Sequence, residues 1–486
     1  MKCFRKFFFK SILSVSLNTV YVNLHGKKMI RILILIFVSI SSVAFAKDIV
    51  PKSEIEIKLS FVPLVKQAAP AVVNIYAKRI IEERRSPFSR DPFFRDFFRN
   101  FGQLQPRVQN SLGSGVILSA DGYVVSNYHV VGGATDIRVV LHDGREISGN
   151  VILSDQESDL AVLKLNSNEV LPYLKLRKSD TVEVGELVLA IGNPFGVGQT
   201  VTNGIISGLA RTGIASGSAK GYFLQTDAPI NPGNSGGALI DISGALVGVN
   251  TSILSRSGGS NGIGFAIPAD LVGQFLIQAK EGRISFVRPW AGMRGQPITF
   301  EMAASLNLPA MSGMIVSELH ELSPFSKIGI EVGDIITKVD GLDINSPAEM
   351  LYRMSVAGIG TKVDISYLSK GLTRTKKVDL VEMPNSNVKD IILGPKLIFP
   401  ELHISELTPE FQSKFGLPFS SKGLIVLDTG RIAGRLGLRS GDLLQEINEK
   451  SVQTIEEAIS AIGTIKSNGS ITINRSGRRI AFSFRL

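Results

Sequence analysis

Cysteine is nearly absent from this chain of 486 residues, which contains only Cys3. Because Cys3 lies in a leader segment, the mature chain has no intramolecular disulfide and no thiol nucleophile, and cysteine catalysis is excluded. The phosphate-binding pattern G-x-x-x-x-G-K-[ST] does not occur either, so the sequence gives no sign of ATP binding. Histidine is scarce, with five residues, which leaves few imidazoles to act as a catalytic base.

Acidic residues are missing from the start of the chain, and this explains most of its basic character. Residues 1–46 hold seven Lys or Arg residues and no Asp or Glu, so only +3 of the formal net charge of +10 belongs to the remainder. A charge confined to a leader does not indicate a nucleic-acid-binding surface. We therefore expect no nucleic-acid partner.

The leader has the three parts of a secretory signal. They are a basic region at Lys27, Lys28 and Arg31, an apolar run at Ile32–Ile40 and an A-x-A pattern at Ala44–Ala46. The apolar run is shorter than the roughly 20 residues of a spanning helix. The sequence therefore predicts export with cleavage near Ala46, and leaves open whether translation starts at Met1 or at Met29.

The length and an ordinary composition, 44% hydrophobic and 20% charged, predict about three globular domains. From about Pro70 to Ile267, short β-branched runs alternate with glycine and asparagine, which is typical of an all-β barrel or sandwich. Residues 82–110 differ, because phenylalanine and arginine dominate there. Such an apolar and charged insertion favours a contact surface, and we interpret it as a self-association or regulatory loop.

An internal repeat occupies the last 200 or so residues. Gly329–Ile336 matches Gly437–Leu444 at an offset of 108, and the match extends to Val339 and Ile447. The Gly-Asp pair in each copy predicts a tight turn that leads into a strand. Two copies of one module therefore follow the β domain.

The most informative motif is the pentad Gly233–Gly237, which holds Ser235 between glycines. Flanking glycines let the backbone turn sharply, expose the hydroxyl and direct N–H groups toward one point, as an oxyanion hole requires. Short glycine motifs also occur as simple turns, so the pentad alone leaves that alternative open.

A serine nucleophile needs a base and an orienting acid. His129 ends an apolar strand pattern, whereas His142 lies in a hairpin-turn pattern, so His129 is the candidate base. Asp159 opens an apolar strand and is expected to be buried. Asp155 and Asp143 are the alternatives, and both lie among polar turn residues, where we expect them to be solvated.

The order of these residues distinguishes two enzyme folds. G-x-S-x-G is also the nucleophile elbow of α/β-hydrolases, in which the serine comes first and a helix follows it. Here two β-like runs follow Ser235, and the order is His129, Asp159, Ser235. That is the order of chymotrypsin-like enzymes, so we predict a mainly β, trypsin-like double barrel.

Five motifs together resemble the HtrA/Do family of periplasmic serine proteases, the DegP/DegQ group. They are Leu224–Leu239, Ser126–Val130, Ser158–Val162, Ile191–Gly196 and Gly262–Pro268. The resemblance implies an ATP-independent endopeptidase that acts on misfolded exported proteins. His129 would be the general base, Asp159 its orienter and Ser235 the nucleophile, with an oxyanion hole from the Gly233 and Ser235 amides beside Asn234.

The same resemblance assigns a specificity pocket to Ile230, Ile253 and Ile263. An aliphatic pocket without a charge suits small or branched apolar residues such as valine and rejects lysine or arginine. Arg211 lies where the family relays activation signals.

The repeated modules resemble PDZ domains, which bind a peptide as an added strand and capture its terminal carboxylate. The carboxylate loop of the first would be Trp290, Ala291, Gly292 and Met293. The corresponding region of the second, Phe399–His403, has a proline and no glycine, so its peptide binding is left open.

The expected organisation follows from these observations. The segments are a leader at 1–46, a protease domain at 47–284, and PDZ domains at 285–384 and 385–486. We expect unfolded or misfolded polypeptides and C-terminal peptides as partners, a homotrimer or larger assembly, peripheral membrane association, and neither cofactor nor metal. The alternative function is a periplasmic chaperone or peptide-binding protein with low proteolytic activity.

Overall fold

The computed structural model divides into two compact units, Met1–Leu59 and Ser60–Leu486. The described residues all belong to the second unit: 60–81, 107–193, 198–212, 221–253, 259–306, 308, 312–384, 389–465 and 468–485. The predicted leader and residues 82–106 of the predicted regulatory loop lie outside them. The described chain begins with a short helix, α2 (Val62–Ala68), and a 3-10 turn, η1 (Ala69–Ala71).

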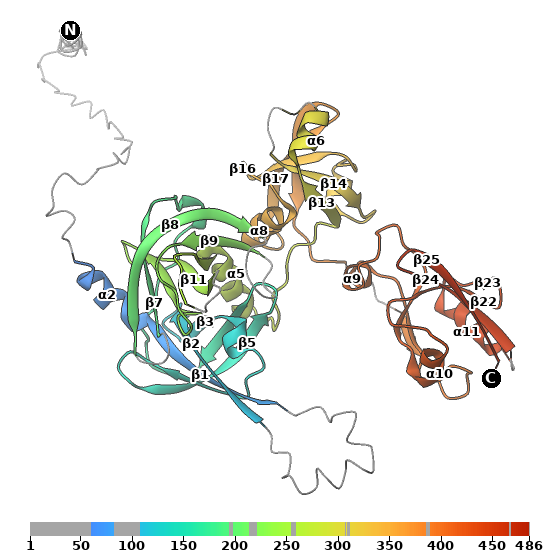
Figure 1. Ribbon diagram of the computed structural model, residues 1–486, viewed down its shortest axis with the longest axis horizontal. Helices are drawn as coiled ribbons and strands as arrows, with labels where there is room; N and C mark the ends of the chain where they lie inside the picture. Colours follow the sequence, from blue (N-terminus) through green and yellow to red (C-terminus); the bar gives the residue numbers. More distant parts are fainter. Residues whose placement is uncertain are drawn as a thin grey trace, which may run out of the picture. The chain divides into compact units, whose positions relative to one another are not determined.

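Six antiparallel strands close the first barrel in the order β1-β2-β3-β6-β5-β4. They are β1 (Val72–Ile81), β2 (Arg107–Ile117), β3 (Tyr123–Ser126), β4 (Asp136–Val140), β5 (Glu146–Asp155) and β6 (Leu160–Leu165), with helix α4 (Tyr128–Val131) after β3. Alternate side chains point inward, as Ile137 and Val139 of β4 do, and form the core with Ile75 and Leu163. Figure 1 shows β1 and β2 extending beyond the barrel as a long hairpin.

The second barrel closes in the order β10-β11-β12-β9-β8-β7. Its strands are β7 (Leu187–Gly192), β8 (Thr200–Thr212), β9 (Tyr222–Thr226), β10 (Ala238–Asp241), β11 (Leu246–Ile253) and β12 (Gly264–Pro268), followed by helix α5 (Ala269–Lys280). One apolar cluster contains residues of both barrels, including Val116 and Leu160 of the first and Ile191 and Phe265 of the second. The predicted double barrel is confirmed.

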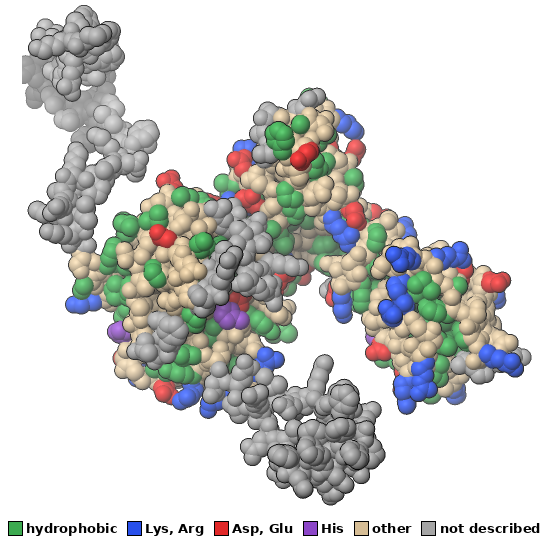
Figure 2. Space-filling view, viewed as in Figure 1, with side chains coloured by type: hydrophobic (Ala, Val, Ile, Leu, Met, Phe, Trp, Pro, Cys, Tyr) green, Lys and Arg blue, Asp and Glu red, His purple; other side chains and the backbone are tan. Residues whose placement is uncertain are grey.

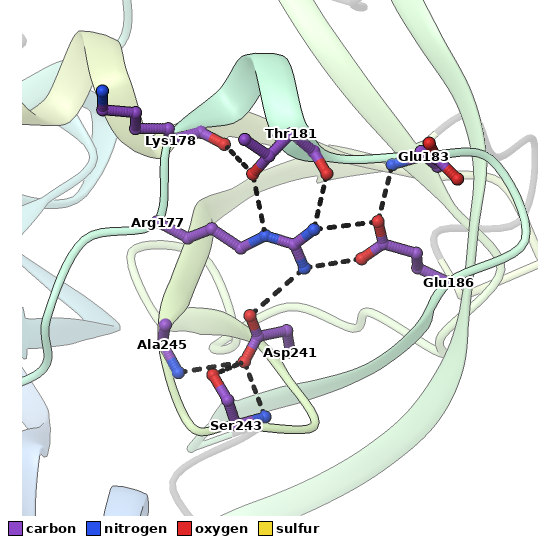
Figure 3. Close-up of polar contacts among 8 residues, drawn as sticks. All are labelled: Arg177, Lys178, Thr181, Glu183, Glu186, Asp241, Ser243 and Ala245. Carbon is purple, nitrogen blue, oxygen red and sulfur yellow. Dashed lines mark hydrogen bonds and ion pairs between the residues drawn. The ribbon is translucent and has the colours of Figure 1, made fainter. Parts of the chain in front are cut away.

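A partly buried ion-pair network fixes the segment between the barrels, which contains the 3-10 turn η3 (Ser179–Thr181). Arg177 donates to both carboxylate oxygens of Glu186, at 2.6 and 2.9 Å, and to Asp241 at 3.2 Å (Figure 3). The other Asp241 oxygen accepts from the Ser243 and Ala245 amides of the β10–β11 turn. Because β10 continues from the segment that carries Ser235, this network anchors the far end of that strand.

The first module forms a sheet in the order β13-β14-β15-β17-β18, with β16 paired to β15. Its elements are β13 (Met293–Pro297), α6 (Phe300–Ser305), β14 (Met314–Leu319), α7 (Pro324–Lys327), β15 (Ile335–Val339), β16 (Leu342–Asp343), α8 (Pro347–Ala357), β17 (Lys362–Ser369) and β18 (Leu372–Asp379). Helix α8 begins at Ser346, whose side chain accepts from the Glu349 amide.

The second module repeats this sheet and adds one strand, in the order β19-β20-β21-β22-β24-β25, with β23 paired to β22. Its elements are β19 (Asp390–Ile392), β20 (His403–Glu406), α9 (Pro409–Lys414), β21 (Leu424–Asp428), α10 (Gly430–Arg435), β22 (Leu443–Ile447), β23 (Lys450–Ser451), α11 (Ile455–Gly463), β24 (Asn468–Arg475) and β25 (Arg478–Arg485). Helix α11 begins at a capping box of Thr454 and Glu457, 108 residues after Ser346 and Glu349. The predicted repeat is therefore confirmed.

The face of the molecule in Figure 2 shows where basic side chains gather. Figure 2 shows Lys and Arg side chains gathered on the C-terminal module in this view, with Asp and Glu among them. Strand β25 contributes Arg478, Arg479 and Arg485, all exposed.

Within the described ranges, no helix is long and apolar enough to cross a membrane.

Candidate active site

His129 and Asp159 meet at the end of the first barrel. His129 lies in the short helix α4, directly after β3, and Asp159 directly precedes β6, the neighbour of β3. The His129 Nδ1 atom is 2.8 Å from Oδ2 and 3.0 Å from Oδ1 of Asp159, and the His129 amide also donates to Oδ1 at 3.0 Å. A carboxylate only accepts, so Nδ1 is the donor, and in the neutral imidazole Nε2 is then the acceptor.

The backbone around Asp159 is bent to present the carboxylate. Asp159 has a φ of 54°, a left-handed conformation that aspartate adopts more readily than most residues. Its carbonyl oxygen accepts from the Tyr128 amide and from Asn127 Nδ2, at 3.2 and 2.9 Å. Asp159 is 8% exposed. These contacts tie the aspartate loop to the start of the histidine helix.

The two alternative aspartates are engaged elsewhere. Asp143 accepts from the Arg145 amide and side chain in an exposed turn, and these contacts hold the pKa of Asp143 below its usual value. The expectation that Asp155 is solvated is wrong. Its carboxylate forms an ion pair with Arg288 and accepts from the Ser158 amide at 2.7 Å. The partner Arg288 is 133 residues away, so no local pattern shows it.

Ser235 lies in a tight loop between β9 and β10. The Asn234 amide donates to the Asn231 carbonyl at 2.9 Å, and Gly233 has a φ of 102°, which with Pro232 before it is the pattern of a type II turn. In the described part of the chain, neither the Gly233 amide nor the Ser235 amide has a hydrogen-bond acceptor. Two unpaired amides on one turn are what an oxyanion hole needs.

Thr251 connects the aspartate to the serine, and the sequence did not reveal it. Its hydroxyl donates to Asp159 Oδ2 at 2.6 Å, and its carbonyl oxygen accepts from Ser235 Oγ at 3.0 Å. Among the described residues, His129 has no hydrogen bond to Ser235. The structure therefore brings the three predicted residues to one site, with Thr251 between two of them.

Ser114 of β2 is a second residue that sequence reasoning missed. Its hydroxyl donates to the Gly233 carbonyl at 2.7 Å and accepts from the Asn193 amide at 2.9 Å, while its own amide donates to the Ser235 carbonyl at 2.8 Å. Ser114 is fully buried. The available signal was the triplet Gly-Ser-Gly, whose first glycine leaves room for Val130, 2.6 Å from where a Cβ would lie.

The three predicted pocket isoleucines are only partly brought together. Ile230 is buried, and Ile253 packs against the same apolar cluster. Ile263 packs against a different apolar cluster, the one that contains residues of both barrels. Gly264 lies against Ile230, because a Cβ there would be 2.8 Å from the Ile230 Cδ1 atom.

The predicted carboxylate loop of the first module precedes the edge strand β13. Gly292 has a φ of 59°, and a Cβ there would lie 2.8 Å from the Trp290 ring. The Gly292 carbonyl accepts from the His320 amide at 2.8 Å, and Ser323 Oγ donates to the Ala291 carbonyl at 2.6 Å. Burial lowers the pKa of His320. Met293 begins β13 itself and packs against the core of the module.

The remaining predictions fall partly outside the described residues. The Arg211 backbone pairs with Phe223 between β8 and β9, and its side chain is not described. In the second module, Phe399 is fully buried in the core rather than in an open loop. Over the described ranges, no group of three or more His, Cys, Asp or Glu side chains is placed to hold a metal ion.

Comparison with known proteins agrees with this geometry. Residues 113–249 match the trypsin-like peptidase domain, and residues 297–380 match the PDZ domain. The chain is 36% identical over 431 residues to a probable periplasmic serine protease do/HhoA-like of Haemophilus influenzae, covering 86% of this chain and 90% of that protein. It is 35% identical over 401 residues to the periplasmic serine endoprotease DegP of Escherichia coli K12, covering 81% of each.

A solved structure shows the same likeness. An HtrA-type protease, AlgW, with a tripeptide is 38% identical and has a TM-score of 0.51, over 68% of this chain and 99% of that one. The Haemophilus and Escherichia relatives, which match 86% and 81% of this chain, are named as serine proteases, and AlgW is named as an HtrA-type protease. The chain therefore belongs to the HtrA/DegP family of periplasmic serine proteases.

Proposed function

We propose that His129, Asp159 and Ser235 cleave peptide bonds through an acyl-enzyme intermediate. His129 Nε2 accepts the Ser235 proton as the hydroxyl attacks the scissile carbonyl, and returns it to the leaving amine. Asp159 keeps the Nδ1 proton in place and stabilises the imidazolium. The observation that carries this proposal is the buried Asp159 carboxylate, which accepts from His129 and from Thr251, the residue that also binds Ser235.

For this reaction the Ser235 hydroxyl must exchange one partner for another. It donates to the Thr251 carbonyl at 3.0 Å, and attack requires that it donate to His129. We propose that the serine side chain turns about its Cα–Cβ bond into another staggered rotamer, which changes the partner of the hydroxyl. The substrate carbonyl oxygen would then lie against the Gly233 and Ser235 amides beside Asn234, where charge develops in the transition state.

We further propose that the enzyme prefers small or branched aliphatic residues before the cleaved bond. Ile230 and Ile253 line one apolar cluster of the second barrel, and Ile263 precedes Gly264, which contacts Ile230. None of these side chains offers a counter-charge to lysine or arginine. Selection by such a pocket rests on apolar contact, which is worth about 1–3 kcal/mol for each methylene.

The first PDZ module is proposed to capture C-terminal peptides through Trp290–Met293, and the relative AlgW was solved with a tripeptide. The substrates would be unfolded or misfolded exported polypeptides, which present extended apolar segments. The relatives are named periplasmic, and we propose the periplasm after cleavage near Ala46. We also propose regulation through Arg211, a trimeric or larger assembly, and peripheral membrane association. The proposed domain limits are those given above.

Casein digestion by the mature chain, compared with its Ser235→Ala variant, tests this function. Turnover is expected to fall about a million-fold, as it does when a serine triad loses its nucleophile. Equal digestion by both forms would refute the catalytic assignment. Digestion by neither form, with aggregation of an unfolded protein still suppressed, would replace the protease by the chaperone alternative.

A further inference from the structure

Strand β20 of the second module occupies the place of β13 in the first. Each strand pairs antiparallel with its next strand, and each pairing contains one register shift at the same point. Gly295 is opposite Val316 in the first module, and Ile404 is opposite Val426 in the second, so Gly295 and Ile404 are equivalent. In both modules this strand contacts the long helix, α8 or α11.

The outer edges of these two strands differ. Strand β13 ends its sheet, and within the described residues no strand pairs with its outer edge. The outer edge of β20 is paired antiparallel with β19, as Ile391 with Ile404 and Ile392 with His403. Hydrogen bonds continue at both ends of this ladder, from the Leu393 amide to the Leu402 carbonyl and from the Glu406 amide to the Lys389 carbonyl.

Side chains of this segment join the apolar core to which β20 and α11 also contribute. Leu393 is 2% exposed in the core of the module, and Ile391 packs against that core. Lys389 pairs with Glu456 in the first turn of α11, at 3.6 Å. Helix α11 also contacts β20. The segment therefore has the main-chain pairing, apolar anchors and position of a peptide bound by strand addition.

We propose that residues 389–393 are a built-in occupant of the peptide groove of the second module, so that only the first module receives peptides. This inference rests on the proposed peptide-binding role of the modules. The physical basis is the effective concentration of the segment at the groove. Because fewer than ten residues join the segment to the groove, it competes with free peptides at millimolar or higher effective concentration. A free peptide would have to displace it and the buried Leu393.

Hydrogen exchange in the intact chain tests the proposal without any substitution. Amides of Ile404 and Glu406 point toward β19, and the Gly295 amide points away from its sheet. We expect exchange of the two β20 amides to be at least about 100-fold slower than that of Gly295 before peptide is added. A peptide ending in a free aliphatic carboxyl terminus should slow Gly295 alone.

The outcomes separate the inference from the proposed function. Fast exchange at β20, or new protection there when the peptide is added, would overturn the inference. Failure of the peptide to protect Gly295 would instead contradict the proposed role of the first module.

A proline pair gives a second test. The alternation of the ladder directs the Ile391 amide toward β20 and the Ile392 amide away from it. Ile391→Pro removes a ladder bond, whereas Ile392→Pro is a matched control that leaves the ladder intact. A synthetic peptide spanning residues 386–395 should bind Ile391→Pro and neither the control nor the unmodified chain.

Exchange at β24 and β25 reports whether the module stays folded in these variants. Absence of binding to a folded Ile391→Pro variant, or equal binding to all three proteins, would refute the built-in occupant.

Discussion

Substitution of Ser114 by alanine should disable catalysis while leaving substrate binding nearly intact. The change removes one hydroxyl that bridges the Gly233 carbonyl and the Asn193 amide. Both backbone groups lose a partner, and a buried group left unsatisfied costs about 1–3 kcal/mol. Part of this cost will be relieved by movement of the turn, and that turn carries the Gly233 amide.

The expected size of the effect follows from the oxyanion hole. Complete loss of one donor costs about 100- to 1,000-fold in kcat, so a displaced donor should cost about 10- to 100-fold. The KM for a peptide substrate with valine immediately before the cleaved bond should change less than about twofold, because the pocket isoleucines are untouched. The affinity for a peptide boronate, which forms a tetrahedral adduct, should fall in proportion to kcat/KM.

Ser126→Ala is the matched control for Ser114→Ala. Ser126 is equally buried, and its hydroxyl makes one hydrogen bond, to the Ser114 carbonyl at 2.7 Å; it lies close to Gly236 but has no hydrogen bond to the Gly233 carbonyl. We expect its kcat to stay within about threefold of the unmodified enzyme, since the bridge to Gly233 remains. A Ser114→Ala enzyme that is folded and has normal kcat, or a control that loses as much, would refute this reasoning.

Three further predictions follow from single contacts. Thr251→Val removes a hydrogen bond to the Asp159 carboxylate and should lower kcat/KM for a peptide substrate about 10- to 100-fold. Thr251→Ser keeps the hydroxyl and should have a nearly normal kcat/KM. An unchanged kcat/KM for Thr251→Val would contradict this prediction. Gly292→Ala should abolish peptide binding in a fluorescence anisotropy titration, because the methyl would overlap Trp290, and unchanged affinity would refute it. Burial lowers the pKa of His320 below its unfolded value of about 6.5. Below that pH the unfolded chain binds more protons at this residue than the folded chain does, so the folded chain loses stability as the pH falls. The melting temperature of the unmodified chain should therefore drop more between pH 7.5 and 5.5 than that of His320→Gln, and equal drops would exclude this residue.

The double barrel and the repeat were predictable because local patterns encode them. Strand β4 alternates buried and exposed residues, and the capping pairs of α8 and α11 recur at the repeat offset. The predicted residues Asp159 and Ser235 lie in short motifs that can be recognised in sequence. Asp159 lies in a turn before a strand, and Ser235 lies in a glycine-rich loop.

The supporting residues could not be predicted, because their roles arise from contacts across the fold. Ser114 and Gly233 are 119 positions apart, and Thr251 and Asp159 are 92 apart. The same reason explains the incorrect expectation for Asp155, whose partner Arg288 belongs to the segment after the barrels. Strand β19 has only three residues, too few for any periodicity to show.

Reaction with an alkyl fluorophosphonate, followed by intact mass and peptide mapping, tests the central claim most directly. A serine hydroxyl is labelled by this reagent only when a neighbouring base removes its proton. The account predicts one adduct per chain, located on Ser235, and labelling that is lost in His129→Ala. Labelling of another residue, or of Ser235 at an unchanged rate in the folded His129→Ala variant, would contradict it.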